Sequence, residues 1–209
     1  MSDQTVFLVD DDPAGRDAVG FLLRSVGIAT ESFDSADAFI SSYDPTRSGC
    51  LVLDIRMPGM SGLELQEWLE EHESPLPVIF LSGHGDVPMT VRGMRKGAVD
   101  FIEKPCKDQQ LLESIRRALA TDDERRARIA AQNAARERFK SLSDRERQVL
   151  DLFVSGKQTK QIAKQLDIRE KTVAAHRSRL YEKLGVDSIV DLVHLAAHAG
   201  TFRPNEELP

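Results

Sequence analysis

The chain has 209 residues and a net charge of −6, and this charge is unevenly distributed. Residues 1–120 carry 11 Lys and Arg against 20 Asp and Glu (−9), residues 121–139 carry 5 against 4 (+1), and residues 140–209 carry 12 against 10 (+2). The acidity of the whole chain therefore leaves a nucleic-acid partner open for the last third, but it excludes binding through a broad basic surface.

Cysteine usage and hydropathy exclude several classes of protein. The two cysteines have no paired spacing, so they form neither a disulfide framework nor a zinc site. No stretch approaches the roughly 20 apolar residues of a membrane span, and the N-terminal residues lack a signal-peptide pattern. We therefore expect a cytoplasmic protein without a membrane partner, with one large or two small domains.

Short apolar runs alternate with helical patterns over the first 120 residues. The expected strands are 5–9, 28–33, 49–54, 77–81 and 99–102. Expected helices start near Pro13, Ser35, Gly62, Asp86 and Asp108. Such alternation through short loops predicts an α/β doubly wound parallel sheet of five strands, in the order 2-1-3-4-5, as a first domain over residues 1–120.

The last of these helices has no stop signal where the first domain should end. Neither Gly nor Pro occurs from there to Arg138, so we expect a long helical linker over 121–139. Ser143 and Glu146 have the spacing of a capping box. Four helices are then expected at 144–154, 158–166, 170–184 and 187–199. Residues 140–209 contain no strand patterns, so we predict that they form a small all-α domain.

Charged and polar side chains follow the ends of the predicted strands. Asp10 and Asp11 follow the first strand, Asp54 ends the third, Ser82 follows the fourth and Lys104 follows the fifth. Strands one and three are neighbours in this order, so their carboxylates should converge and would repel one another without a cation such as Mg²⁺. Asp54 can then act as a nucleophile for a phosphoryl group. For Asp54 alone, a helix cap or turn former remains the alternative.

The motifs at these strand ends resemble the receiver domain of two-component response regulators, over residues 5 to about 120. They read Val-Asp-Asp-Asp, Leu-Asp-Ile-Arg-Met-Pro-Gly-Met-Ser-Gly, Ser-Gly-His-Gly and Glu-Lys-Pro, and the segment 83–89 looks like the FixJ branch. The resemblance implies that a sensor histidine kinase phosphorylates Asp54 with Mg²⁺ as cofactor. It implies that Asp11 binds Mg²⁺ directly, Asp10 through water, and that Asp54 and the carbonyl of Arg56 complete the site.

The same resemblance implies a switch of three residues, Ser82, Phe101 and Lys104. Phe101 is expected to turn inward when Ser82 moves toward the phosphoryl group, although plain core packing of Phe101 is an equal alternative. Cys106 departs from the family, which usually carries Phe there. We favour a small buried residue over a redox role at that position, and loop or surface positions for the histidines at 72 and 84.

Two central helices of the last third have the spacing of a helix-turn-helix. Val173, Leu180 and Leu184 share one face of the second helix, which leaves a polar face opposite. That face can enter the major groove of DNA, or it can be the solvated side of an ordinary bundle. The pattern alone leaves both open.

Three segments of this third resemble the LuxR/NarL-type DNA-binding domain: 142–146, 161–163 and 171–177. The resemblance implies promoter double-stranded DNA as a partner, contacted by Lys171, Thr172, Ala174, Ala175, His176, Ser178, Arg179 and Lys183. Because positions 174 and 175 are alanine, direct base contacts are few, and we expect much of the specificity to come from DNA shape or half-site spacing.

The final helix usually dimerises in that family. Its apolar stripe of Ile189, Leu192, Val193 and Ala196 fits this role, although the same stripe can simply be core. The sequence thus predicts a response regulator whose phosphorylation shifts the receiver to an active, dimeric, promoter-binding state.

Two other functions are alternatives to this prediction. An Asp-nucleophile phosphatase usually carries a second acid two residues after the nucleophile, and here that position is Arg56, so we do not expect an enzyme. A regulator that works independently of phosphorylation is the second alternative.

Overall fold

The structure, a computed structural model, describes residues 4–83 and 87–199. It divides the chain into two compact units, Met1–Arg126 and Ala127–Pro209. Helix α5 (Asp108–Lys140) contributes residues to both units. The domain limits expected from the sequence, with a separate linker at 121–139, remain a prediction.

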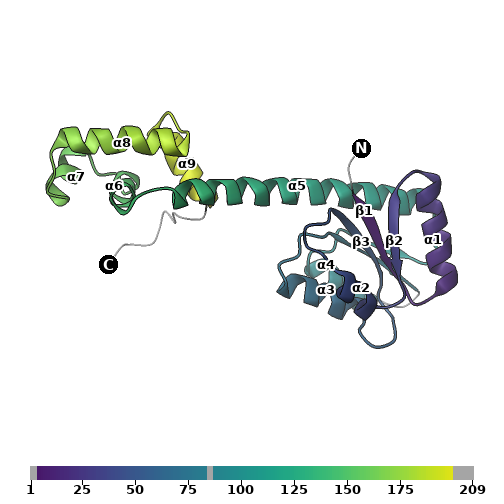
Figure 1. Ribbon diagram of the computed structural model, residues 1–209. Coiled ribbons are helices and arrows are strands. Elements are labelled where there is room, and N and C mark those ends of the chain that lie inside the picture. The colour runs from purple at the N-terminus through teal and green to yellow at the C-terminus, as the bar shows by residue number, and fades with distance from the viewer. Residues whose placement is uncertain (1–3, 84–86, 200–209) are drawn as a thin grey trace. The chain divides into compact units, whose positions relative to one another are not determined.

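Strands and helices alternate through the first unit, as the sequence predicts. The described strands are β1 (Thr5–Val9), β2 (Ala29–Phe33), β3 (Gly49–Asp54), β4 (Val78–Ser82) and β5 (Asp100–Glu103). The helices before α5 are α1 (Pro13–Ser25), α2 (Ala36–Ser42), α3 (Gly62–Glu71) and α4 (Val87–Arg95). All paired strands are parallel, in the order β2-β1-β3-β4-β5. Figure 1 labels the first three of these strands, β1, β2 and β3. The predicted doubly wound sheet is confirmed.

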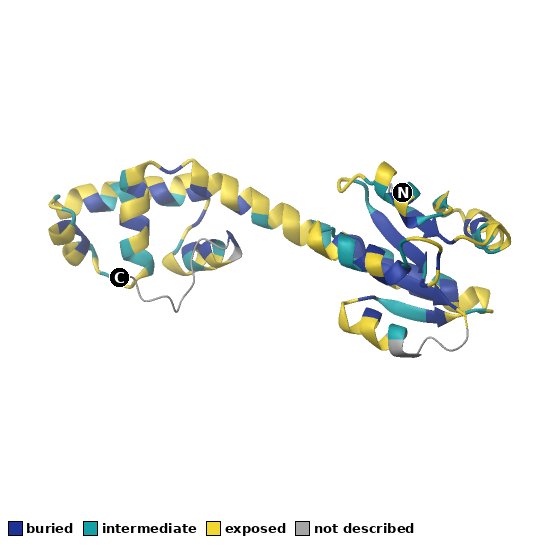
Figure 2. Ribbon diagram, turned by 90° about the horizontal axis from the view of Figure 1, so that it is seen from below, coloured by how far each residue is buried: buried dark blue, intermediate teal, exposed yellow. Residues whose placement is uncertain are grey.

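The sheet lies between two apolar layers. On one face α2 and α3 pack against it through Phe39 and Leu69, and on the other α1 and α5 pack through Leu23 and Ile115. The central strands are buried between these layers (Figure 2), which is why their sequences are continuous apolar runs rather than alternating ones. Complete burial of one side chain such as Leu23 contributes about 1.5–3 kcal/mol to folding.

A side-chain cap determines where α1 begins. Asp12 accepts hydrogen bonds from the backbone N–H groups of Ala14 and Gly15, both at 3.1 Å. The cap satisfies amides that have no partner inside the first turn, so the helix begins directly after the acidic residues that follow β1. The predicted cap Asp86 and the loop residue His84 lie outside the described residues.

The described part of the second unit is helical throughout. After the end of α5 it contains α6 (Asp144–Val154), α7 (Thr159–Gln165), α8 (Glu170–Leu184) and α9 (Ile189–Ala199). The predicted capping box at the start of α6 is confirmed, because Ser143 and Glu146 each bind the other's backbone N–H. Ala135 and Phe139 of α5 pack into the same core as Val173, so α5 is part of this unit's hydrophobic core.

Helix α5 runs for 33 residues without interruption, which confirms the expected long helix between the two domains. Its residues 127–131 are exposed, so this segment relies on its own helix-forming Ala and Arg residues rather than on packing. Over residues 4–83 and 87–199, none of the helices combines the length and apolarity needed to cross a membrane.

Candidate functional site

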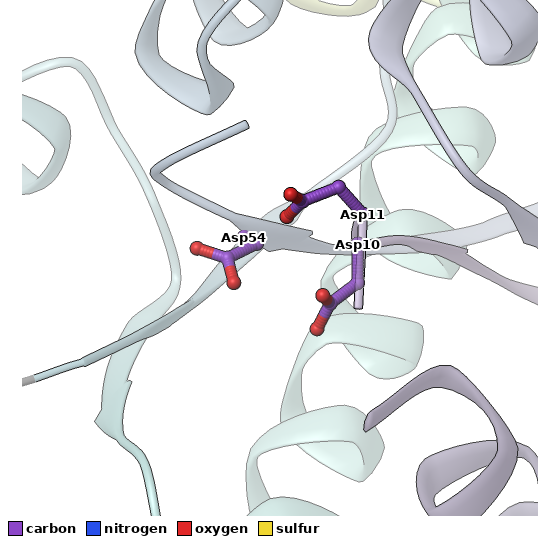
Figure 3. A group of neighbouring side chains, drawn as sticks. All are labelled: Asp10, Asp11 and Asp54. Carbon is purple, nitrogen blue, oxygen red and sulfur yellow. The ribbon is translucent and has the colours of Figure 1, made fainter. Parts of the chain in front are cut away.

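Three carboxylates meet at the carboxyl edge of the sheet. Asp54 is the last residue of β3, and Asp10 and Asp11 follow β1, its neighbour in the sheet. One carboxylate oxygen from each lies within 4.8 Å of the other two (Figure 3). Asp10 is buried, Asp54 is half-buried and Asp11 is exposed. The strand order thus brings together residues that stand 44 positions apart in the sequence.

The ammonium group of Lys104 neutralises part of this charge. Its Nζ donates to Asp10 Oδ2 at 2.6 Å and to Asp54 Oδ2. The backbone N–H of Lys104 donates to the carbonyl of Ser82 at 2.7 Å, which holds the lysine beside β4. Burial acts to lower the pKa of Lys104, but the hydrogen bonds with Asp10 and Asp54 outweigh it and raise the pKa above its ordinary value. Lys104 therefore stays charged at neutral pH.

The remaining carboxylate oxygens differ in their partners. Asp10 Oδ1 accepts from the backbone N–H of Asp12, and Asp54 Oδ1 accepts from that of Arg56, each at 2.9 Å. The side chain of Asp11 makes no hydrogen bond or ion pair with any residue that the structure describes. Three clustered carboxylates, one of them without a hydrogen-bond or ion-pair partner in the described part of the chain, form a donor set that suits a hard divalent cation such as Mg²⁺.

One residue beside this cluster, Arg16, is not among the site residues predicted from the sequence. The guanidinium of Arg16 donates to the backbone carbonyl of Asp10 at 2.5 Å, which ties the first turn of α1 to the acidic cluster. Its only signal in the sequence is its position in that first turn.

The carbonyl of Ser82 accepts from the backbone N–H of Lys104, and Phe101 stands on β5, three residues before Lys104; the switch role of these residues remains a prediction. Ser82 is fully buried and its hydroxyl donates to the carbonyl of Gly83 at 3.2 Å. Phe101 is half-buried, pairs in register with Phe80 and packs against the core on one face of the sheet. Both readings of Phe101, as a switch residue and as plain core, are compatible with this position.

Gly62 allows the loop after β3 to close tightly behind Asp54. A Cβ atom on Gly62 would lie 2.2 Å from the backbone carbonyl oxygen of Asp54. We expect Gly62→Ala to lower the free energy of unfolding by about 1–3 kcal/mol, because the backbone must shift to relieve the overlap. Urea unfolding followed by the fluorescence of Trp68, the chain's only tryptophan, measures this. Gly83→Ala, where a Cβ meets nothing within 4 Å, is the matched control; equal stabilities of the two variants would contradict the prediction.

In the second unit, α7 and α8 form the predicted helix-turn-helix, with α8 as its longer helix. Val173, Leu180 and Leu184 of α8 are fully buried, as expected. Six of the predicted DNA-contacting residues are exposed and Ala174 and His176 are half-buried; the exposed ones are Lys171, Thr172, Ala175, Ser178, Arg179 and Lys183. The polar face of α8 is therefore accessible in this unit.

Two of these side chains already have partners inside the unit. Lys183 Nζ donates to the buried carboxylate of Glu146 at 2.7 Å and to the carbonyl of Ser141 at 3.3 Å. Ser178 Oγ donates to the carbonyl of Ala174 at 3.2 Å. Lys183 and Glu146 are 37 positions apart, so no local sequence pattern indicates this pair. DNA contact by each individual residue remains a prediction.

The predicted dimerisation stripe on α9 is divided between core and surface. Leu192 and Ala196 are 0% and 2% exposed and belong to the core of the unit, so in this conformation they are unavailable to a second copy. Ile189 is 40% exposed and Val193 is half-buried. The core alternative therefore describes Leu192 and Ala196, while dimerisation through Ile189 and Val193 remains a prediction.

A parallel sheet with an acidic cluster and a lysine at its carboxyl edge, continued by a long helix into a helix-turn-helix unit, defines the class of two-domain response regulators. Two family models match in agreement with this: the response regulator receiver domain over residues 6–116 and the bacterial regulatory proteins of the luxR family over residues 140–196. The chain belongs to the FixJ/NarL family of two-component response regulators, with a LuxR-type DNA-binding domain. It is a DNA-binding transcriptional regulator, in a family where phosphorylation and dimerisation are typical.

Relatives with both domains match over nearly the full chain. The response regulator protein TodT of Pseudomonas putida is 43% identical over 197 residues, which cover 93% of this chain and 87% of TodT. The transcriptional regulatory protein FixJ of Rhizobium meliloti is 43% identical over 205 residues, 98% of this chain and 100% of FixJ. The solved structure of the response regulator StyR matches with a TM-score of 0.83 and 46% identity, covering 94% of this chain and 99% of StyR.

Proposed function

We propose that Asp54 accepts a phosphoryl group from the phosphohistidine of a partner sensor kinase. A carboxylate oxygen of Asp54 attacks the phosphorus atom, the bond from phosphorus to the histidine nitrogen breaks, and the imidazole leaves. The observation that carries the proposal is the position of Asp54 at the end of a buried strand, with its side chain 13% exposed and in contact with a charged lysine. The ammonium group of Lys104 can then bind the phosphoryl oxygens, which carry the negative charge after the transfer.

Mg²⁺ is the proposed cofactor of this transfer. Asp11 would bind it directly and Asp10 through water, and Asp54 and the carbonyl of Arg56 would complete the ligand set. When bound, the ion supplies positive charge that offsets the repulsion between the carboxylates and the incoming phosphoryl group. Support for this assignment comes from the oxygen-only donor set and from the exposed carboxylate of Asp11.

The output of phosphorylation is a shift of the receiver toward an active state. Ser82 moves toward the phosphoryl oxygens and Phe101 turns inward, which changes the surface that a second copy meets. The resulting dimer places two copies of α8 on paired half-sites of promoter DNA, and DNA shape contributes much of the specificity. Since the partner is chromosomal DNA, we place the protein in the cytoplasm.

We further propose that the protein is not an enzyme. Arg56 stands two residues after Asp54, where an Asp-nucleophile phosphatase usually has its second acid, and the relatives named above are regulators. Incubation with a phosphate ester should therefore consume no more than one equivalent per chain. Turnover beyond one equivalent would contradict this.

Light scattering after size-exclusion chromatography tests the proposed switch. Wild type and Asp54→Asn are compared with and without Mg²⁺ and beryllofluoride, which mimics a phosphoryl group on a carboxylate. We expect the mass of wild type to double only with both additions and the mass of Asp54→Asn to stay unchanged. Doubling in both proteins would show that dimerisation does not depend on Asp54, and no change in either would refute the dimeric output.

A further inference from the structure

A buried carboxylate on α5 lies outside the site described above. Asp122 is 0% exposed, although it stands beyond Ala118 and Leu119, the last α5 residues that pack on the sheet's apolar layer. Its Oδ2 accepts from the hydroxyl of Ser48 at 2.6 Å and from the backbone N–H of Gly49 at 2.9 Å. A buried charge is tolerated only when it is paired and hydrogen-bonded, so this arrangement is a built polar site.

Arg126 completes the site one helical turn later. Its Nε lies 2.9 Å from Asp122 Oδ1 and 2.8 Å from Oδ2. The two other guanidinium nitrogens donate to three consecutive carbonyls of the loop before β3: Nη1 to Pro45 at 3.1 Å and Thr46 at 3.3 Å, and Nη2 to Arg47. One side chain thus binds both the helix and the loop, a geometry that the planar fork of arginine permits and lysine cannot reproduce.

A second tie holds the same segment of α5. Gln4, directly before β1, donates through Nε2 to the carbonyl of Leu119 and to Asp123 Oδ1, both at 3.0 Å. Together the two ties attach α5 residues 119–126 to the amino edge of the sheet. The first compact unit ends at Arg126, and the continuously exposed stretch 127–131 of α5 begins directly after it.

The polar site formed by Asp122, Arg126 and the loop before β3, called the network below, lies at the opposite end of β3 from Asp54. Gly49 is the first residue of β3 and Asp54 is the last, so a single buried strand connects the network to the proposed phosphorylation site. Gly49 is also packed so closely against β1 that a Cβ would lie 1.8 Å from the carbonyl oxygen of Thr5. The amino end of β3 therefore has little freedom to absorb a displacement before it reaches α5.

We propose that Asp122 and Arg126 are positioning residues for the regulator's output: a polar clamp that holds the outgoing part of α5 on the receiver. This rests on the proposed function, in which phosphorylation of Asp54 changes DNA binding. With the clamp intact, residues 119–126 move with the receiver when its conformation changes. Without the clamp, this segment of α5 unfolds locally. The receiver can then still be phosphorylated, but its conformational change is no longer transmitted to the helix.

The test uses the full chain with Arg126→Lys, which keeps the positive charge beside Asp122 but loses the fork to the three carbonyls. Arg128→Lys is the matched control, since Arg128 is exposed on the same helix and makes no hydrogen bond or ion pair with the described residues. A double variant, Asp122→Asn with Arg126→Gln, removes both charges and so avoids an unpaired buried carboxylate. Three quantities are measured: labelling by acetyl phosphate with Mg²⁺, hydrogen exchange of the α5 amides, and affinity for a duplex selected from random-sequence DNA by phosphorylated wild type.

We expect normal labelling in all variants. In both clamp variants, amides 119–130 should exchange about tenfold faster than in Arg128→Lys, and the ratio of DNA affinities with and without phosphorylation should fall at least about fivefold. Faster exchange with an unchanged affinity ratio would overturn the positioning role, and unchanged exchange would overturn the clamp itself. If phosphorylation did not change the DNA affinity of the wild type, both the proposed function and the positioning role would be refuted. The hydrogen-exchange rates of the α5 amides would then still show whether Asp122 and Arg126 hold the helix.

Discussion

Replacing Lys183 by methionine should lower the free energy of unfolding of the helical unit by about 2 kcal/mol. Lys183 was predicted from the sequence as a DNA contact, but its ammonium group binds Glu146, whose side chain is 5% exposed. Removing the lysine leaves a buried carboxylate with only the capping bonds from Ser143. The side chain of Lys183 is 40% exposed, and solvent screening reduces the cost below that of a fully buried pair.

The same pair has a pH signature. The hydrogen bond from Lys183 and the backbone bond from Ser143 lower the pKa of Glu146 from its ordinary 4.5 to about 2. A carboxyl group with a lowered pKa stabilises the fold fully above its ordinary pKa, and this stabilisation is lost as the pH falls from 4.5 toward 2. In Lys183→Met the pKa of Glu146 in the folded protein is less lowered, so the acid-dependent loss should be smaller and should be complete at a higher pH.

Hydrogen exchange of the amides in α6 and α8 measures the stability of this unit separately from the receiver. Glu146→Gln is the matched control, because glutamine can still complete the capping box but cannot titrate. The double variant closes a thermodynamic cycle that isolates the pair. If Lys183→Met weakened DNA binding strongly while exchange and acid stability stayed at wild-type values, Lys183 would be a DNA contact rather than a structural residue.

Most of the fold could be predicted from patterns of residues that are close together in the sequence. The limits of β3 follow from an apolar run that ends at a charged residue and is followed by Pro58 and Gly59, and the structure has the predicted bounds of 49–54. The convergence of Asp10 and Asp54 required one further step, the strand order, which alternation of strands and helices strongly restricts. Each of these inferences uses residues close in sequence or a rule of topology.

Contacts between distant positions could not be obtained in this way. The spacing of Asp122 and Arg126 permits an ion pair on one helix, but Ser48, which donates to Asp122, lies 74 residues away from it. The apolar stripe on α9 has helical periodicity, which predicts an apolar face but not what that face packs against. In the structure Leu192 and Ala196 are buried in the unit's own core, while Ile189 is exposed. Such assignments depend on how helices pack, and an amphipathic pattern is equally compatible with core and with an interface.

Replacing Lys104 by methionine should separate two effects of its charge. The ammonium group lies 2.6 Å from Asp10 Oδ2 and also binds Asp54, so it competes with a divalent cation for the same carboxylates. Its removal should tighten Mg²⁺ binding by about tenfold, since one unit charge at this range contributes about 1–4 kcal/mol in a partly solvated site. Phosphorylation by acetyl phosphate should nevertheless slow by about 100-fold, because Lys104 no longer stabilises the developing charge on the phosphoryl oxygens.

Both effects should be constant with pH around neutrality, because the hydrogen bonds with Asp10 and Asp54 raise the pKa of Lys104 and keep it protonated there in the wild type. Titration calorimetry with Mg²⁺ and the rate of labelling at saturating Mg²⁺ give the two quantities independently. Lys107→Met, a change at an exposed lysine three residues later, should alter neither. Weaker Mg²⁺ binding in Lys104→Met would mean that the lysine holds the three carboxylates in place for the ion instead of competing with it, and the cluster would then depend on Lys104 for its geometry.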